Sequence, residues 1–171
     1  MQDAHKIVET LRHYRHDYLN DIQLIKSYTA LGKTEKVNQV IDRISQRAEQ
    51  ESRLSSLNAP GLAEFLLTYN WKSPRVPIDT VKVYSSGDDW SREEAKAVNF
   101  LKEFTSWAGE SADTSVTARV SVILDNEKRK QLTVEFKGRL QQNEKPYFLK
   151  KNNVELNWHS TSVNARVLLD E

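Results

Sequence analysis

The first part of the chain alternates apolar and polar positions with the period of an α-helix. Between Ala4 and Ala30, successive apolar positions lie 4, 3, 4, 4 and 3 residues apart, which places them on one helix face. These positions are Ile7, Leu11, Tyr14, Tyr18, Ile22 and Ile25. A second run with helical spacing fades toward residue 57 and contains Val37, Val40, Ile41, Ile44 and Ala48. The pattern predicts two consecutive helices.

The connection between these two helices is short. Gly32 can take the left-handed conformation that ends a helix, and Thr34 can cap the next one. Two long helices joined in this way must fold back antiparallel. Each has an apolar arc wider than one hairpin can bury, so a second copy would cover the remainder in a four-helix bundle. We therefore predict that residues 1–58 form a helical hairpin that makes a homodimer.

Residues 58–61, Asn-Ala-Pro-Gly, interrupt the helical pattern and mark a domain boundary. Beyond them, alternating segments typical of strands are mixed with helical segments. Strands are predicted over residues 76–84 (with an irregularity near Asp79), 116–124, 131–136, 154–158 and 163–169, and helices over 62–69, 93–107 and 141–151. This mixture predicts an α+β fold, in which residues 62–171 form an antiparallel or mixed sheet covered by helices.

The predicted helix over residues 93–107 has a start signal of its own. Ser91 is a favourable N-cap, and Glu94, three residues on, would complete a capping box. The spacing of the apolar residues behind it predicts which side chains face the core. They are Ala95, Val98, Leu101, Phe104 and Trp107.

Composition narrows the range of functions. A net charge of +1, from 25 Lys and Arg against 24 Asp and Glu, is too small for a protein that coats nucleic acid. The chain has no cysteine, which excludes disulfides, thiolate metal sites and a cysteine nucleophile. The five glycines are too widely spaced for a P-loop or a dinucleotide fingerprint. With no signal peptide and no run of about 20 apolar residues, we expect a cytoplasmic protein without a membrane partner.

Three of the four histidines, His5, His13 and His16, lie on the first predicted helix. At 100° per residue, His16 falls roughly 150° from the centre of the apolar stripe, so its side chain should project into solvent. His13 lies near the same polar face. The plainest interpretation is a pair of surface histidines.

The residues around His16 could assist a reaction at its imidazole ring. If Asp17 accepts a hydrogen bond from the N–H of one ring nitrogen, the other nitrogen keeps its lone pair and can act as a nucleophile. Arg12 or Arg15 could neutralise an incoming phosphoryl group, and Asn20, one turn along, would lie beside its oxygens or a water. A divalent metal held by His13, His16, Asp17 and Asn20 is an alternative, but no second histidine cluster completes such a site. We therefore predict no metal and no cofactor bound by the chain itself.

Two segments carry a resemblance to a known family. RHDYLNDIQLIKSY (residues 15–28) and LAEFLLTYNWKS (residues 62–73) resemble the sporulation-initiation phosphotransferase B family of the bacillus phosphorelay. The resemblance implies a dimeric four-helix bundle with one phosphorylatable histidine per protomer, which matches His16. It also implies a C-terminal α/β sandwich that resembles a degenerate ATP-binding domain of histidine kinases. The helix over residues 93–107 contains Asn99 but no Asn-Ala-x-Lys signature, and no Asp-x-Gly-x-Gly follows it.

The function implied by the resemblance is that of a phosphotransferase. A small response regulator would donate the phosphoryl group of its phosphoaspartate to His16, which would pass it to an aspartate of the transcription factor that controls sporulation. The regulator would supply the Mg²⁺. The regulator itself would be contacted by Arg12, His13, Arg15 and Gln23. Two alternatives remain: an autokinase that uses ATP, which a flat calorimetric titration with Mg-ATP would exclude, and a dimerisation scaffold with an incidental histidine.

Overall fold

The computed structural model describes residues 2–84, 88–141, 144–150 and 153–169. The chain divides into two compact units, Met1–Glu51 and Ser52–Glu171. The first unit is helical and the second contains the sheet, so each is described separately below.

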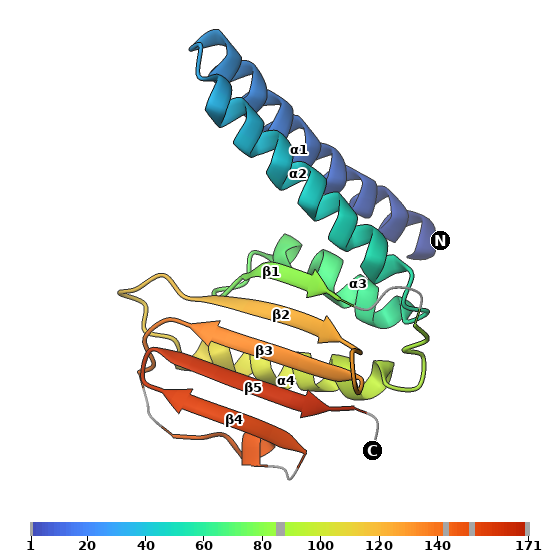
Figure 1. Ribbon diagram of the computed structural model, residues 1–171, viewed down its shortest axis with the longest axis vertical. Helices are drawn as coiled ribbons and strands as arrows, with labels where there is room; N and C mark the ends of the chain where they lie inside the picture. The colour runs from blue at the N-terminus through green and yellow to red at the C-terminus, as the bar shows by residue number, and fades with distance from the viewer. Residues whose placement is uncertain (1, 85–87, 142–143, 151–152, 170–171) are drawn as a thin grey trace. The chain divides into compact units, whose positions relative to one another are not determined.

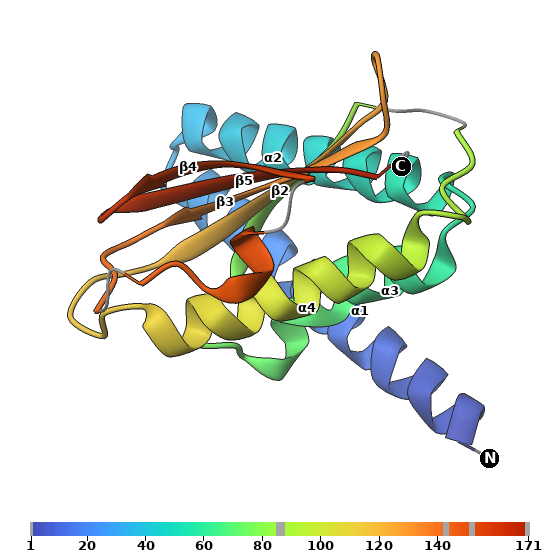
Figure 2. The same cartoon turned by 90° about the horizontal axis from the view of Figure 1, so that it is seen from below.

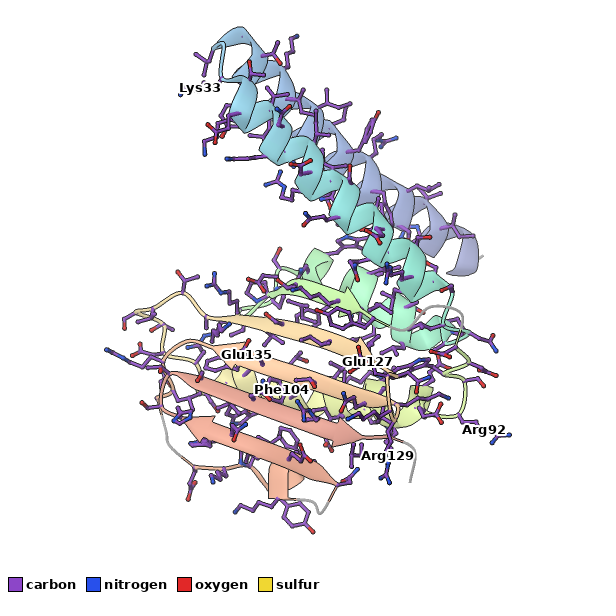
Figure 3. The ribbon with its side chains drawn as sticks, viewed as in Figure 1. Lys33, Arg92, Phe104, Glu127, Arg129 and Glu135 are labelled. Atoms are coloured by element: carbon purple, nitrogen blue, oxygen red, sulfur yellow. The ribbon has the colours of Figure 1, made fainter. Side chains whose placement is uncertain are left out.

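The first unit is a helical hairpin made of α1 (Gln2–Ala30) and most of α2 (Thr34–Ser55), which run antiparallel (Figure 1). The turn between them, marked by Lys33 in Figure 3, has Gly32 at φ +68°. The Gly32 N–H donates to the Thr29 carbonyl at 3.0 Å and the Lys33 N–H to the Tyr28 carbonyl at 2.9 Å, the pair of bonds that defines a Schellman motif. The predicted role of Gly32 is therefore confirmed.

The predicted cap of α2 is wrong by one residue. Thr34 is the first residue of the helix, and the Lys33 carbonyl accepts the bond from the Val37 N–H at 3.1 Å. The cap position therefore belongs to Lys33, because its carbonyl receives the first helical hydrogen bond while its own backbone is still in the turn.

The apolar stripe of α1 does not form the seam of the hairpin. Ile7, Leu11 and Tyr18 are 59%, 61% and 65% exposed, whereas the buried residues of the hairpin are Asp21 on α1 and Val40 on α2. On a helical wheel the direction of the stripe differs from that of Asp21 by roughly 60°. Within this chain the stripe is therefore an apolar face beside the seam, and α2 does not cover it.

The second unit is a mixed sheet with helices. Within the described residues, five strands form one sheet in the order β1-β2-β3-β5-β4, with β1 parallel to β2 and the other neighbours antiparallel. The bounds are α3 Pro60–Thr68, η1 Tyr69–Lys72, β1 Ile78–Val83, α4 Glu94–Ser111, β2 Arg119–Asp125, β3 Gln131–Lys137, η2 Tyr147–Lys150, β4 Val154–His159 and β5 Ser162–Leu168. Figure 2, which shows the sheet nearly edge-on, places α3 and α4 on the same side of it. The predicted α+β class is confirmed.

The core of the second unit lies between the sheet and α4. Alternate residues of the central strands are fully buried, Val120, Val122 and Leu124 on β2 and Leu132, Val134 and Phe136 on β3. Phe104 of α4, labelled in Figure 3, is also fully buried and lies within 5.4 Å of Trp107, 6.0 Å of Phe100 and 6.5 Å of Phe148, measured between ring centroids. The strict alternation explains why the strands were predictable from the sequence.

The predicted capping box at the start of α4 is wrong. The helix begins at Glu94, and its N-cap residue is Glu93, whose side chain makes no capping hydrogen bond. The Ser91 N–H donates to Asp89 Oδ1 at 2.9 Å. Glu94 instead accepts hydrogen bonds from the N–H groups of Gly61 and Leu62 in the first turn of α3. Its carboxylate therefore caps α3, a helix that begins 34 residues earlier in the chain.

Three smaller differences concern helix faces and boundaries. On α4 the predicted core residues Val98, Leu101, Phe104 and Trp107 pack in or against the core. Ala95 is exposed instead, and Ala97 and Phe100 are also buried. The register shift between Ile78 and Thr80 confirms the irregularity near Asp79. Of the helix predicted over residues 141–151, the described part contains only the 3₁₀ turn η2, and residues 142, 143 and 151 lie outside the described residues.

The cap supplied by Glu94 leads to a stability prediction. Glu94→Ala should lower the free energy of unfolding by about 1 kcal/mol, the usual effect of losing a helix cap. Urea denaturation measures it, and Glu94→Gln, which keeps an acceptor oxygen in the same place, should lose less. Equal stability of the wild type and Glu94→Ala would show that the cap is unimportant.

Candidate functional site

His16 lies on the polar face of α1 with its side chain 73% exposed. Arg12, Arg15, Asp17 and Asn20 are exposed around it. The helical wheel predicted this exposure, and the structure confirms it. The imidazole is therefore accessible to another macromolecule without any rearrangement of the hairpin.

The ring of His16 is held from one side. Its Nδ1 atom lies 3.2 Å from Asn20 Nδ2, one turn along the helix, and 3.4 Å from Asp17 Oδ1. Within the described residues, Nε2 has no hydrogen-bond partner. Because both contacts are made at Nδ1 and the side chain is exposed, Nε2 is available to a partner molecule.

The other predicted site residues differ in their exposure. Arg12, Arg15 and Gln23 are exposed, so the two guanidinium groups are available to an anionic partner. His13 is half-buried and lies closer to the hairpin seam than His16 does. The structure therefore leaves the surface around His16 cationic and polar.

Sequence reasoning missed Asp21, which the structure places inside the hairpin. Its side chain is 9% exposed and its carboxylate is bound by Arg43 at 3.1 Å and by Arg47 at 2.5 Å, both from α2. The two arginines are four residues apart and so lie on one face of α2. This interaction fixes the register of α1 against α2 at the residue directly after Asn20. The i, i+4 arginine pair was the signal that could have indicated it.

A second polar contact between the helices lies on the other side of His16. Burial raises the pKa of Glu51 on α2. The positive charge of Arg47 partly opposes this rise, and the negative charge of Asp17 adds to it. Burial, followed by the negative charge of Glu51, also raises the pKa of Tyr14. Asp17 therefore belongs to a charge network that spans both helices of the hairpin.

The alternative of a metal site gains no support. In the parts of the chain that the structure describes, no three His, Cys, Asp or Glu side chains are grouped so as to hold a metal ion.

An open cleft of about 430 Å³ lies against α4 in the second unit. It is lined by Asn99, Lys96 and Lys102 from the helix and by Asn153, Val154 and Val167 from the sheet side. The Lys96 ammonium donates to the main-chain carbonyl of Leu168 at 3.0 Å. This cleft is lined by Asn99, the asparagine that the sequence singled out on this helix.

No helix in the described parts of the chain has the length and apolar character needed to cross a membrane.

Comparison with known proteins accounts for both units. The family described as "Sensor kinase SpoOB-type, alpha-helical domain" matches residues 1–57, and the family described as "Sporulation initiation phospho-transferase B, C-terminal" matches residues 58–167. The chain belongs to the sporulation initiation phosphotransferase B family. A curated member of this family, sporulation initiation phosphotransferase B of Bacillus subtilis (strain 168), is 32% identical over 100 residues. These residues are 58% of this chain and 52% of the relative, so the chain spans about half the length of that protein.

Two solved structures are more distant. The histidine kinase domain of the blue-light activated histidine kinase from Erythrobacter litoralis EL346 is 20% identical, with a TM-score of 0.43, over 63% of this chain and 59% of its own. A second structure of that kinase is 15% identical, with a TM-score of 0.46, over 90% of this chain and 59% of its own. Likenesses at this level leave the function to be argued from the site and from the family.

Proposed function

We propose that this protein is a phosphorelay histidine phosphotransferase that acts between two response regulators of sporulation. His16 accepts the phosphoryl group from the phosphoaspartate of one regulator and passes it to an aspartate of the second. The observation that carries the proposal is the exposed imidazole of a family member, held at Nδ1 and open at Nε2. The proposal places the protein in the cytoplasm, with no role for nucleic acid or a membrane.

The proposed reaction is two displacements at phosphorus. In the first, the lone pair on Nε2 attacks the phosphorus, the N–P bond forms, and the bond to the aspartate oxygen breaks, so that the donor leaves as a free carboxylate. The ring is then an imidazolium that carries phosphorus on Nε2 and a proton on Nδ1. In the second, a carboxylate oxygen of the acceptor attacks the phosphorus and the electron pair of the N–P bond returns to Nε2.

The residues around His16 support these steps through charge and position. Asp17 accepts a hydrogen bond from the Nδ1–H group, which stabilises the tautomer with the lone pair on Nε2. Arg12 and Arg15 neutralise the equatorial oxygens of the phosphoryl group and attract an acidic pocket, and His13 and Gln23 contact the regulator. The chain binds no cofactor of its own in this proposal. The Mg²⁺, which would neutralise phosphoryl charge, arrives in the acidic pocket of the regulator.

The exposed apolar stripe of α1 supports a homodimer. Burial of Ile7, Leu11 and Tyr18 against a second copy would remove apolar surface from water and complete a four-helix bundle. His16 lies on the other side of the helix, so it would remain accessible in that dimer. The second unit would then act as a degenerate kinase-type domain that supports the bundle or contacts a partner.

The dimer can be tested at Leu11. Leu11→Asp should weaken dimerisation by about 100-fold or more, because it places a charge in the apolar core of the proposed bundle. Sedimentation equilibrium measures the change. Ser27→Asp, which adds the same charge at an exposed position of the same helix, should leave the dimer intact. A monomeric wild type, or equal dissociation constants for the wild type and Leu11→Asp, would contradict the stripe as the interface.

The role of Asp17 gives a kinetic prediction. Asp17→Ala should slow phosphoryl transfer about three- to ten-fold, because an exposed hydrogen bond contributes about 1 kcal/mol. The rate of transfer from a phosphorylated regulator, followed by rapid quench, measures the effect. Asp42→Ala, at an exposed position on α2, is the matched control and should be unchanged. If Asp17→Ala transfers at the wild-type rate, tautomer selection by this carboxylate is unimportant.

The whole relay is tested with three purified proteins. A radiolabelled phosphorylated donor regulator is mixed with the sporulation transcription factor in the presence or absence of this chain. The proposal predicts label on the second regulator only when the chain is present, with an acid-labile intermediate on the chain. Transfer at the same rate without the chain, or a chain that never acquires label, would favour the scaffold alternative.

A further inference from the structure

The Nδ1 atom of His16 faces two side chains that make opposite demands on it. Asn20 Nδ2, at 3.2 Å, carries only protons and can bond only to a lone pair. Asp17 Oδ1, at 3.4 Å, is an acceptor when ionised and can bond only to an N–H. A ring nitrogen carries either a proton or a lone pair, so Nδ1 can satisfy one of these neighbours at a time.

The two neighbours therefore favour different tautomers of the free ring. Asp17 stabilises the form with the proton on Nδ1, in which Nε2 has the lone pair needed for attack. Asn20 stabilises the form with the proton on Nε2, in which that nitrogen is not a nucleophile. The two contacts lie at similar distances, 3.2 and 3.4 Å, so each tautomer of the free ring has a partner at Nδ1.

The same competition has a second consequence once Nε2 bears phosphorus. If Nδ1 keeps its proton, the ring is an imidazolium and a good leaving group. If that proton passes to the Asp17 carboxylate or to water, Nδ1 has a lone pair, the ring is neutral and the N–P bond is harder to break. Only the neutral form can accept the hydrogen bond from Asn20.

On the basis of the proposed function, we propose that Asn20 is a positioning residue that prolongs the life of the phosphohistidine. It donates to the bare Nδ1 of the neutral phosphorylated ring, while Asp17 stabilises the protonated ring from which the phosphoryl group leaves. The pair sets the balance between holding the phosphoryl group and releasing it. In a relay with two successive partners, this balance decides how much of the phosphoryl group is lost to water between them.

The test uses phosphoramidate, which phosphorylates exposed histidines without a regulator. Its P–N bond breaks, ammonia leaves, and an N–P bond to the ring forms. After removal of the reagent, ³¹P NMR follows the decay of the His16 phosphoramidate, which is identified by its absence from His16→Ala. Long-range ¹⁵N–¹H correlation of the unphosphorylated protein measures the tautomer of the same ring. The variants are Asn20→Asp and Asp17→Asn, with Asn38→Asp at an exposed position of α2 as the control.

We expect Asn20→Asp to shorten the phosphohistidine lifetime about three-fold or more and to shift the free ring toward the Nδ1–H tautomer, as expected for a hydrogen bond of ordinary net strength. Asp17→Asn should lengthen the lifetime and shift the tautomer the other way, and Asn38→Asp should change neither. Unchanged lifetimes and tautomers in both variants, or shifts in the same direction, would overturn the proposal. Neither measurement needs a regulator, so the two proposals can fail separately. A protein that does not relay could still show these shifts, and a protein that relays could show none of them.

Discussion

His16→Ala is expected to abolish phosphoryl transfer to the chain, with a loss of about 1,000-fold or more from the wild-type rate. In the proposed reaction the substitution removes the nucleophile, and in nucleophilic catalysis loss of the nucleophile leaves only the contribution of binding. Because His16 is exposed and its side chain does not pack in the hairpin, the fold and the helix content should not change. Transfer from a radiolabelled regulator, followed by gel analysis under alkaline conditions, measures the loss.

The matched control for this prediction is His5→Ala. His5 is also an exposed histidine on α1, but it lies three turns away from the Asp17 and Asn20 contacts. It should transfer at the wild-type rate. Full labelling of His16→Ala would move the phosphoryl acceptor elsewhere in the chain and would remove the basis of the proposed function.

Phe104→Ala is expected to lower the free energy of unfolding of the second unit by about 3–5 kcal/mol, the range for truncating a buried aromatic side chain. Phe104 is fully buried between α4 and the sheet, where it contacts the rings of Phe100, Trp107 and Phe148. The neighbouring rings are held by their own strands and helices and can only partly fill the cavity. Denaturant unfolding followed by near-UV circular dichroism reports on these aromatic side chains directly.

Tyr147→Ala is the control for that measurement. Tyr147 is also aromatic but is 82% exposed, so its removal should change stability by less than about 0.5 kcal/mol. A loss below about 1 kcal/mol for Phe104→Ala would mean that the aromatic cluster does not hold α4 against the sheet.

The features that the sequence predicted well depend on short-range periodicity. Strands β2 and β3 alternate buried and more exposed residues without interruption, and the hairpin follows from two helical runs separated by Gly32. These signals arise from neighbours in the chain, where geometry alone fixes which side chains share a face. The exposure of His16 was predictable for the same reason.

The features that the sequence did not predict depend on distant partners. Glu94 resembled half of a capping box because Ser91 precedes it, yet its carboxylate binds the first turn of α3. The spacing along α1 gives no sign that Asp21 is buried, because its partners, Arg43 and Arg47, lie on α2. In each case the tertiary structure supplies a partner that no local spacing reveals.

In the candidate site, the sequence indicated the residues but not every contact. Asp17 was predicted to bind one ring nitrogen of His16, and it lies 3.4 Å from Nδ1. Asn20 was predicted to lie beside the phosphoryl oxygens or a water, which stays a prediction, and its contact with the same Nδ1 atom at 3.2 Å was not foreseen. A spacing of four residues places Asn20 on the same helix face as His16, and Asp17 is the next residue in the chain, but the rotamers decide which atoms meet.

The most direct measurement locates the phosphoryl group after a single transfer. The chain is incubated with a phosphorylated response regulator, separated from it under alkaline conditions, and examined by ³¹P NMR and by mass spectrometry of its peptides. We predict one phosphoryl group per chain, bonded to Nε2 of His16. A phosphoryl group on another residue, or none while the regulator still carries its own, would contradict the account.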